Sequence, residues 1–413
     1  MAIESKIFTP VKIGPVTLRN RVIRSAAFEN MAYDNSPSQD LYDYHVAVAR
    51  GGVGMTTLAY AAVAKSGLSF KGQLWMRKEI VPGLKRITDA IHAEGAKASI
   101  QLGHCGNMTH RSTCGCLPVG ASGGFNMYSP TFVRALKINE IHGLVSDFGN
   151  AVNLAREAGF DSVEIHCGHG YLIDQFLNTY FNHRHDEYGG TLENRMRFMT
   201  LCMEEVMKAA GNDMAVIAKM NMRDGLKHPG TTIDESIQIA RRLQELGTHA
   251  IVLSGGLVSA TPMYVMRGEM PIYTMTHYMD KAWLKYGVRA FGKMMVPTVD
   301  YTEAYFLEDA LAFRKALPDM KFIYVGGLVA GDKINEVLSH GFEAVQMARS
   351  LLNERDFVNQ LKKDPHHRCT CGHSNYCIAR MYSREMACHK QLCEQLPKAI
   401  VKEIERIEKE QNR

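Results

Sequence analysis

Eight strand-length apolar segments alternate with helix-length amphipathic segments along the 413 residues, and a group of polar side chains directly follows one of them. Together these two observations predict an α/β fold, a (β/α)8 or TIM barrel, with its active site at the carboxyl ends of the strands. The predicted strands are Val22 to Ala26, Val53 to Ala59, Ala96 to Leu102, Ser162 to His166, Ala215 to Met220, Ala250 to Ser254, Phe322 to Val325 and Ala344 to Met347.

Composition favours an ordinary globular protein, with 46% hydrophobic and 22% charged residues. Lys and Arg total 48 against 43 for Asp and Glu, and a dispersed net charge of +5 does not indicate a nucleic-acid or membrane partner. The N-terminus lacks the apolar segment of a signal peptide, and no uncharged apolar run is long enough to span a membrane. We therefore expect a cytoplasmic protein.

Three segments do not fit the alternation of strand-length and helix-length segments. Residues 7–19 have the alternating pattern and Gly-Pro punctuation of a hairpin, which we expect to close the bottom of the barrel. Residues 103–136, rich in Gly, Ser, Cys and Thr, should form a loop over the barrel mouth. Residues 255–300, after the sixth strand, are rich in Met and aromatic residues, which predicts either a packed capping subdomain or an adaptable apolar pocket for a bulky substrate.

The C-terminal residues 364–413 differ in pattern from residues 1–363, which contain the predicted barrel. Five of the ten cysteines, at positions 369, 371, 377, 388 and 393, crowd into this part, which in a cytoplasmic chain indicates metal or cluster ligation rather than disulfides. From Pro397 to about Glu410 a charged helix is predicted to dock on the body through one apolar face. That face consists of Ile400, Val401, Ile404 and Ile407.

His166, His169 and Tyr171 form the polar group that directly follows the fourth predicted strand. A lone histidine there would most often be a structural residue, but two histidines and a tyrosine at a strand end favour a catalytic site. Two imidazole N–H groups can hold one carbonyl oxygen, and a nearby phenol can deliver a proton.

These residues lie in E-I-H-C-G-H-G-Y-L-I-D-Q-F-L, which is followed by N-H-R-H-D-E-Y-G-G-T-L-E-N-R-M-R-F and ends at Phe198. The whole stretch resembles the signature of the old yellow enzyme family of FMN-dependent ene-reductases, in the branch related to 2,4-dienoyl-CoA reductase. The resemblance extends from about Ile7 to about Asp356. It implies that residues 1–363 are an FMN-binding barrel that uses NADH or NADPH as reductant.

The resemblance also implies which residues hold the flavin. The backbone at Ser25, Ala26 and Ala27 should face the ring, with Ala59 beside it and the Gln101 amide at the pyrimidine edge. Lys219 should place its charge near the N1/C2 carbonyl, unless it forms an ion pair with a carboxylate. The phosphate should lie on the loops after the seventh and eighth strands, at Gly326, Gly327, Ala348 and Arg349. No G-x-G-x-x-G follows a strand, so a Rossmann domain is not supported.

In the implied reaction, hydride passes from flavin N5 to the β-carbon of an α,β-unsaturated carbonyl compound. His166 and His169 would hold the carbonyl oxygen, and Tyr171 would protonate the α-carbon. The substrate could be an enoate, an enone, a dienoyl thioester or a steroid-like enone, and the chain could form a homo-oligomer. One departure is Asn107, which stands where the family often has an arginine.

Relatives of the dienoyl-CoA reductase type bind a [4Fe–4S] cluster through cysteines, and some carry C-x-H-C-N-x-C followed by a further cysteine. Here Cys371 and Cys377, followed by Cys388, match this form with Ser374 in place of the middle cysteine, and Cys369 could compensate. The resemblance thus leaves a cluster, a zinc site and a metal-free segment open. A cluster would imply an electron-donor protein as partner.

Two other functions compete with ene-reduction. An amine dehydrogenase or demethylase of the trimethylamine dehydrogenase type would tether its flavin to a cysteine near the first strand, but residues 24–28 (R-S-A-A-F) contain none. A non-catalytic regulatory protein that binds flavin or metal would not need the proton donor Tyr171 beside two histidines.

Overall fold

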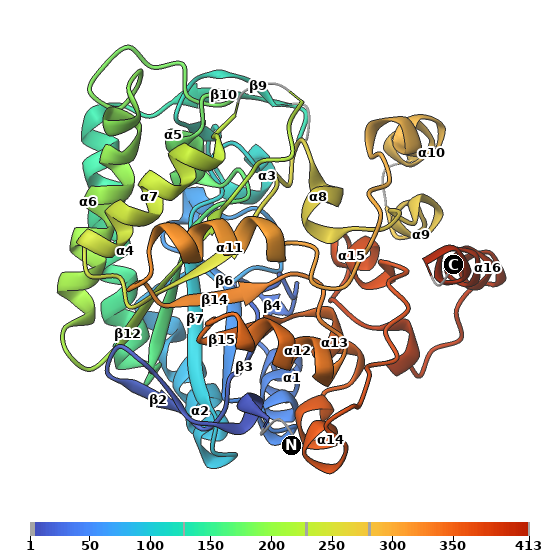
Figure 1. The fold of residues 1–413 in the computed structure, drawn as a ribbon. Helices are drawn as coiled ribbons and strands as arrows, with labels where there is room; N and C mark the ends of the chain where they lie inside the picture. The colour runs from blue at the N-terminus through green and yellow to red at the C-terminus, as the bar shows by residue number, and fades with distance from the viewer. Residues whose placement is uncertain (1–4, 127–128, 228–229, 280–281, 412–413) are drawn as a thin grey trace.

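The computed structural model describes residues 5–126, 129–227, 230–279 and 282–411, and it confirms the predicted (β/α)8 barrel (Figure 1). Eight parallel strands form a closed barrel in chain order, and the last strand pairs with the first. The barrel strands are β3 (Val22–Arg24), β6 (Met55–Ala62), β7 (Lys97–Gly103), β11 (Ser162–Cys167), β12 (Ala215–Asn221), β13 (Ala250–Ser254), β14 (Phe322–Val325) and β15 (Ala344–Met347).

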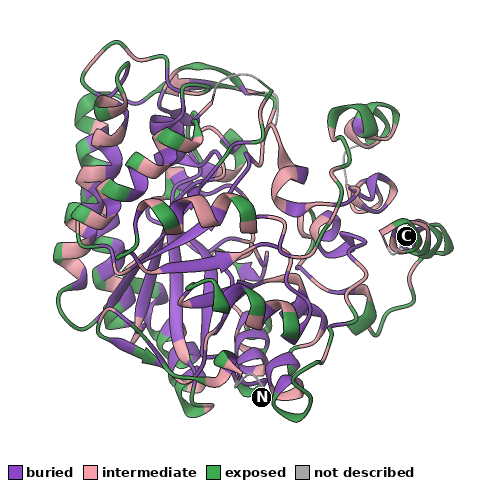
Figure 2. Cartoon of the chain, viewed as in Figure 1, coloured by how far each residue is buried: buried purple, intermediate pink, exposed green. Residues whose placement is uncertain are grey.

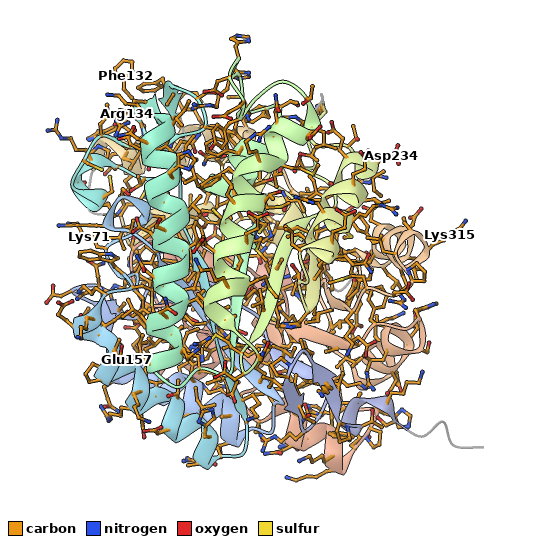
Figure 3. The ribbon with its side chains drawn as sticks, turned by 90° about the vertical axis from the view of Figure 1, so that its left-hand side faces the viewer. Lys71, Phe132, Arg134, Glu157, Asp234 and Lys315 are labelled. Carbon is orange, nitrogen blue, oxygen red and sulfur yellow. The ribbon has the colours of Figure 1, made fainter. Side chains whose placement is uncertain are left out.

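Helices surround the barrel, and Figure 2 shows the buried strands inside a layer of helices whose outer faces are exposed. Side-chain caps start several of them: Ser38 and Thr191 each accept a backbone hydrogen bond, and Thr232 forms a capping box with Glu235. The surrounding helices are α1 (Gln39–Arg50), α2 (Val81–Ala93), α4 (Ile138–Glu157), α6 (Leu192–Ala210), α7 (Ile233–Glu245), α11 (Leu307–Ala316), α12 (Gly331–Ser339), α13 (Arg349–Asn353) and α14 (Phe357–Lys363). Figure 3 shows the face on which α4 runs down to Glu157.

The predicted hairpin is confirmed as β1 (Val11–Ile13) and β2 (Val16–Leu18), which pair antiparallel. Its buried side chains pack against residues near the start of the barrel strands, among them Ile23 and Met55. The hairpin therefore closes the bottom of the barrel, as predicted.

The insertion at residues 103–136, predicted as a loop over the barrel mouth, contains short elements that were not predicted. This insertion contains α3 (Arg111–Cys114) and a small sheet of β8 (Val119–Gly120), β9 (Gly124–Asn126) and β10 (Thr131–Ala135), with β10 in the centre. Strands this short, in a stretch rich in Gly and Ser, leave little periodicity to detect. Two further short elements, the β4–β5 pair (Ala32–Tyr33 and Ser36–Pro37) and α5 (Leu172–Leu177), lie in other loops after strands.

The excursion after β13 folds into α8 (Pro262–Met266), α9 (Ile272–His277) and α10 (Ala282–Met295). Met263, Met270 and Ile272 form a small separate core with Ala379 from the C-terminal segment. The excursion is therefore a packed subdomain beside the barrel, next to the C-terminal segment (Figure 1).

The C-terminal segment contains α15 (Tyr376–Met381) and α16 (Lys398–Gln411). Three of the four residues predicted on the docking face of α16 are buried, but Val401 is 37% exposed, so that part of the prediction was wrong. The same helix is also held by the Glu403 carboxylate, which accepts hydrogen bonds from the backbone N–H groups of Tyr273 and Thr274, at 3.0 and 2.8 Å. None of the described helices is long and apolar enough to cross a membrane.

Candidate active site

A cavity opens at the carboxyl ends of the barrel strands, and most residues predicted for the site line it. Those lining residues are Ser25, Ala26, Ala27, Gln101, His166, His169, Tyr171, Lys219, Gly327, Ala348 and Arg349. Ala59 and Gly326 do not line the cavity, although each has a chain neighbour that does. The topology therefore brings these residues together from the ends of six strands, β3, β7, β11, β12, β14 and β15.

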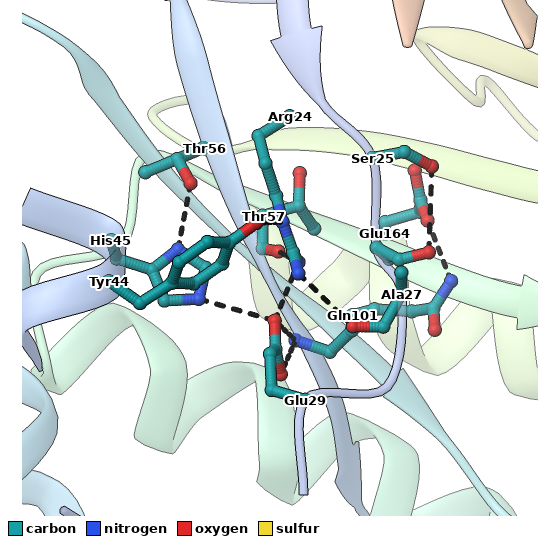
Figure 4. Close-up of polar contacts among 12 residues, drawn as sticks. Arg24, Ser25, Ala27, Glu29, Tyr44, His45, Thr56, Thr57, Gln101 and Glu164 are labelled. Carbon is teal, nitrogen blue, oxygen red and sulfur yellow. Dashed lines mark hydrogen bonds and ion pairs between the residues drawn. The ribbon is translucent and has the colours of Figure 1, made fainter. Parts of the chain in front are cut away.

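A buried carboxylate, Glu164, lies behind the lining residues Gln101 and Lys219, and Figure 4 shows it beside Gln101 and Ser25. Its Oε1 atom lies 2.9 Å from Lys219 Nζ and accepts a hydrogen bond from Gln101 Nε2 at 2.7 Å. Its Oε2 atom accepts from Gln346 Nε2 at 2.6 Å. Burial lowers the pKa of Lys219, and the neighbouring Glu164 opposes this shift. The ion pair expected as the alternative role of Lys219 is thus present, and Lys219 also lines the cavity.

A second buried carboxylate, Glu29, organises the backbone next to the cavity (Figure 4). It lies 2.6 Å from Arg24 Nη1 and 3.2 Å from His45 Nε2, and it accepts a hydrogen bond from the backbone N–H of Ala59 at 3.1 Å. The carbonyl oxygen of Glu29 accepts from the backbone N–H of Met386 at 2.7 Å. Glu29 therefore connects β3, β6 and the C-terminal segment.

The two histidines at the end of β11 are hydrogen-bonded to each other. The backbone N–H of Gly168 donates to His166 Nδ1 at 3.4 Å, so the proton of a neutral His166 ring belongs on Nε2. His166 Nε2 lies 3.3 Å from His169 Nδ1, and His169 Nε2 lies 2.7 Å from Ser254 Oγ. Burial is the main cause that lowers the pKa of both rings, that of His169 to about 3. Both imidazoles are therefore neutral at pH 7, and each carries one N–H donor.

A polar network below this pair fixes the backbone of His169, which has a φ of +61°. Asn221 Oδ1 accepts a hydrogen bond from the backbone N–H of His169 at 3.0 Å, and Asp174 Oδ2 accepts from that of Gly170 at 2.7 Å. Asn221 Nδ2 in turn donates to Asp174 and Asp224, at 3.2 and 3.0 Å. Burial, together with the neighbouring Asp224, raises the pKa of Asp174.

Tyr171 packs between an imidazole and a second phenol. Its ring centroid lies 4.4 Å from that of His166 and 5.1 Å from that of Tyr60. Among the described residues, none lies within hydrogen-bond distance of the Tyr171 hydroxyl, which leaves this group available to a ligand. Burial, with a smaller effect from Cys105, raises the pKa of Tyr171 above its ordinary value, so the phenol stays protonated at neutral pH.

The far end of the cavity has the chemistry of an anion site. Arg349, at the end of β15, donates to Asn375 Oδ1 at 2.8 Å, and no carboxylate of the described chain lies within ion-pair distance of it. Gly327 has a φ of +69°, and a Cβ atom there would lie 2.6 Å from Tyr305 Cε1. A cation without a carboxylate partner, next to a glycine turn at the end of a barrel strand, fits a phosphate group.

The outer wall of the cavity is mainly apolar and aromatic. Phe28 stacks on Phe70 with ring centroids 4.7 Å apart, and Phe70 makes an edge contact with Tyr382 at 6.0 Å. The other apolar wall residues come from the excursion after β13 and from the C-terminal segment: Val258, Val265, Met266, Ile378 and Met381. Asn107, at the position where an arginine was expected, accepts a hydrogen bond from Gln175 Nε2 at 3.0 Å and so joins its loop to α5.

The four cysteines predicted as ligands gather behind the cavity, around Asn353. Asn353 Oδ1 lies 3.3 Å from Cys369 Sγ, and Asn353 Nδ2 lies 3.2 Å from Cys388 Sγ. Cys371, Cys377 and Cys388 line a small cavity of about 20 Å³. Within the described part of the chain, no three His, Cys, Asp or Glu side chains are arranged to hold a metal ion. The thiols are therefore sufficient in number for a cluster, although the described side chains are not arranged around a metal ion.

Comparison with known proteins assigns the fold and site to a family. The family model described as NADH:flavin oxidoreductase / NADH oxidase matches residues 6–285, more than half of the chain. The chain belongs to this family. As a member of it, the protein is a flavin-dependent oxidoreductase that uses NADH or NADPH, and the predicted relation to old yellow enzymes is confirmed.

Individual relatives of this NADH:flavin oxidoreductase differ in how much of the chain they match. The 4,4′-dithiodibutanoate disulfide reductase of Rhodococcus erythropolis is 38% identical over 378 residues, which cover 91% of this chain and 93% of that protein. An NADPH dehydrogenase of Listeria monocytogenes is 35% identical over 267 residues, covering 62% of this chain and 76% of the relative. The solved structure of an old yellow enzyme homologue from Zymomonas mobilis has the same fold, with a TM-score of 0.69 at 22% identity over 88% of this chain and 94% of that one.

Several residues of the site were not found by sequence reasoning. They are Glu29, Glu164, Asp174, Asn221 and Ser254. For Glu164 a signal was available, because it is a charged residue inside the apolar strand S-V-E-I-H. The other four lie at strand ends, in a loop or, for Asp174, in the short helix α5, where a polar side chain is ordinary.

Proposed function

We propose that this oxidoreductase reduces the activated carbon–carbon double bond of a neutral α,β-unsaturated carbonyl compound, with NADH or NADPH as reductant. The observation that supports this proposal best is the arrangement of His166, His169 and Tyr171 on the wall of the cavity that also contains the predicted flavin contacts. A carbonyl-binding pair and a proton donor in one cavity are what this reaction requires from the protein.

The cavity suits FMN, and we assign its contacts to residues of four strand ends. The backbone at Ser25 to Ala27 would face the ring. The side-chain amide of Gln101, which is hydrogen-bonded to Glu164, would contact the pyrimidine edge. Lys219 would lie near N1, with a charge that Glu164 partly balances. Arg349 would bind the phosphate, because no carboxylate among the described residues competes for it. When bound, FMN would supply hydride taken from the nicotinamide.

The histidine pair would bind the substrate carbonyl through its two N–H groups. His166 Nε2–H now faces His169, and a carbonyl oxygen between the rings would accept that hydrogen bond in its place. His169 would turn its Nε2–H from Ser254 to the same oxygen. Two donors on one carbonyl oxygen draw electron density from the β-carbon, which makes it a better hydride acceptor.

Tyr171 would complete the reaction as the acid. Its hydroxyl has no partner among the described residues, and its raised pKa keeps the proton in place until a strongly basic α-carbon lies near it. The proton would pass from the phenolic oxygen to the α-carbon, and solvent would restore it afterwards.

The walls of the cavity favour an uncharged, bulky substrate over a free carboxylate. Aromatic and aliphatic side chains from four separate segments form the outer wall, namely residues 28, 70, 258–266 and 378–382. Lys219 and Arg349 are the cations that line the described cavity, and we assign both to the flavin. An enoate would therefore lose its hydration without gaining a charged partner.

An anaerobic flavin titration tests the proposal. The protein is reduced with NADH or NADPH, and then cyclic enones, enoates and dienoyl thioesters are added while the yellow absorbance is followed. Recovery with enones at the lowest concentrations supports the proposal, and recovery only with the acids contradicts the proposed selectivity. Bleaching by amines, without recovery on addition of alkenes, would instead support the amine-dehydrogenase alternative.

A second electron acceptor is favoured by one comparison. The relative that covers 91% of the chain is named for the reduction of 4,4′-dithiodibutanoate. We therefore include this disulfide in the titration. If it alone restores the yellow absorbance, disulfide reduction replaces ene-reduction as the proposed reaction.

The proposed reaction moves electrons in pairs and does not need a cluster. A cluster at Cys369, Cys371, Cys377 and Cys388 would serve only to accept single electrons from a partner protein. Assays of iron and acid-labile sulfide on protein purified without oxygen test this cofactor. About four of each per chain would identify a [4Fe–4S] cluster.

A further inference from the structure

A pair of cysteines in the insertion after β7 has no role in the flavin chemistry. Cys114 is the last residue of α3, and Cys116 follows it after one glycine. The two sulfur atoms lie 3.9 Å apart. Both thiols are free, but Cys114 is only 2% exposed whereas Cys116 is exposed to solvent.

The backbone between the two cysteines allows their sulfur atoms to meet. Gly115 has a φ of +76°, a conformation that reverses the chain after α3 and that residues with a side chain rarely adopt. Cys114 Sγ also lies 3.2 Å from the carbonyl oxygen of Cys116, so the side chain already points back at its partner. A modest rotation of the exposed Cys116 side chain would bring the sulfurs to bonding distance.

Cys116 is accessible to solvent and has two cations near its sulfur atom. Burial and the neighbouring Cys114 raise its pKa, while the cations Arg134 and Lys65 oppose this rise by stabilising the thiolate. Lys65 forms no ion pair with any described residue, and Figure 3 shows Arg134 at the edge of the molecule. Cys116 is thus reachable from solvent, with a second thiol directly behind it.

We propose that Cys114 and Cys116 form a thiol–disulfide exchange site that reacts with low-molecular-weight disulfides. The thiolate of Cys116 attacks one sulfur of the disulfide, whose other half leaves as a thiolate and takes a proton from solvent. The Cys114 thiol then loses its proton, and its sulfur attacks Cys116 in the mixed disulfide and releases the second half. Two thiols of the protein are oxidised to one disulfide, and the small disulfide is reduced to two thiols.

This inference does not depend on the flavin reaction, and its test does not use turnover. The holoprotein is freed of reductant and treated with 2-hydroxyethyl disulfide at about pH 8.5, where a thiol of raised pKa forms more thiolate. After acid quenching and tryptic digestion, peptide 112–134 contains Cys114 and Cys116 as its only cysteines. We expect this peptide to lose two hydrogen atoms and to carry no adduct.

The chain provides its own control. Cys393 is also exposed, and peptide 391–398 contains no other cysteine. Because the structure places no second thiol next to it, Cys393 should retain the mixed-disulfide adduct. In Cys114→Ser, peptide 112–134 should likewise retain the adduct, on Cys116. In Cys116→Ser it should stay unmodified, because Cys114 is buried.

Three results would overturn the inference. The wild-type peptide 112–134 could retain an adduct as Cys393 does, it could carry two adducts, or it could stay unmodified while Cys393 reacts. The first two would show that the sulfurs do not meet, and the third that Cys116 is not reactive. Retained flavin absorbance in both variants confirms that the outcome concerns the thiols rather than misfolding.

Discussion

Lys219 and Glu164 form a buried ion pair at the floor of the active-site cavity, with 2.9 Å between Nζ and Oε1. The two residues are on adjacent strands, β12 and β11, and both side chains are almost fully buried. Glu164 also accepts hydrogen bonds from Gln101 and Gln346, so its two oxygens serve three donors. Such a carboxylate cannot be replaced without leaving buried donors unsatisfied.

The first prediction concerns this pair. Glu164→Gln should lower the free energy of unfolding by about 3–5 kcal/mol, because it leaves the Lys219 charge buried without a partner. The new amide would also direct an N–H group at one of the glutamine donors. Urea unfolding with excess FMN measures the change.

The exposed pair Lys208–Glu205, 3.5 Å apart, provides the matched control for this prediction. Glu205→Gln should change the free energy of unfolding by less than about 1 kcal/mol. Equal effects of the two substitutions would show that the buried ion pair of Glu164 contributes no more to the free energy of unfolding than the exposed pair does.

The second prediction separates the two halves of the reaction. Tyr171→Phe should slow reoxidation of the flavin by an enone about 100-fold or more, since the general acid is lost, while reduction by the nicotinamide stays within about twofold. Stopped-flow absorbance follows each half-reaction. Tyr60→Phe is the control, because the Tyr60 hydroxyl already contacts the Gly67 carbonyl oxygen and Ser69 Oγ, at 3.2 and 3.1 Å. Equal slowing of both half-reactions in Tyr171→Phe would remove Tyr171 from the acid role.

The third prediction follows from buried neutral histidines. Burial lowers the pKa of His104 and of His169 to about 3, whereas in the unfolded chain each should titrate near about 6.5. Below about pH 6.5 the unfolded chain binds protons at these histidines and the folded protein does not. The free energy of unfolding is therefore highest above about pH 6.5 and decreases as the pH drops. Between pH 6.5 and pH 5.0 each histidine should lower the free energy of unfolding by about 2 kcal/mol.

Urea midpoints measured between about pH 7.5 and about pH 5.0 test this dependence on pH. His104→Gln removes one of the two groups without touching the proposed catalytic pair. Over this pH range the variant should therefore lose about 2 kcal/mol less of its free energy of unfolding than the wild type does. An unchanged slope in His104→Gln would mean that His104 is protonated in the folded protein.

The barrel could be predicted from the sequence, and the support of its active site could not. Strands such as A-I-V-L-S are continuous apolar runs because a parallel barrel buries both of their faces, and that pattern is local. The histidine pair and Tyr171 were found because they directly follow such a strand. Asn221 and Asp174, by contrast, hold the backbone of residues 169 and 170 from another strand and from a helix. Which polar residue meets which backbone group depends on tertiary geometry that no spacing records.

The short elements within the insertion after β7 were not predicted, for a related reason. Strands β8 and β9 have only two or three residues and are held by pairing with β10, so each is too short to show a period of its own. Similarly, Val401 lies within the apolar stripe of α16, yet the helix contacts its neighbours through Ile400, Ile404 and Ile407. The period of a helix predicts an apolar face, but the partner determines how much of that face is covered.

The last prediction contrasts two glycines. Gly327, at the proposed phosphate end of the cavity, has a φ of +69°, and an added Cβ would lie 2.6 Å from Tyr305 Cε1 and 2.8 Å from Tyr301 Cε2. Gly327→Ala should therefore lower the free energy of unfolding by at least about 2 kcal/mol, from backbone strain and from displacement of two rings. It should also weaken FMN binding, since those rings lie beside Arg349.

Gly143 is the control for this substitution, because it lies on the exposed face of α4 and an added Cβ would meet nothing within 4 Å. Gly143→Ala should raise the free energy of unfolding by about 0.5–1 kcal/mol, as alanine favours the helix, and should leave FMN affinity unchanged. Urea unfolding and fluorescence titration of FMN measure both quantities in each variant. If Gly327→Ala bound FMN as tightly as Gly143→Ala, the turn after β14 would not form part of the phosphate site, and Arg349 would have to hold the phosphate from β15 alone.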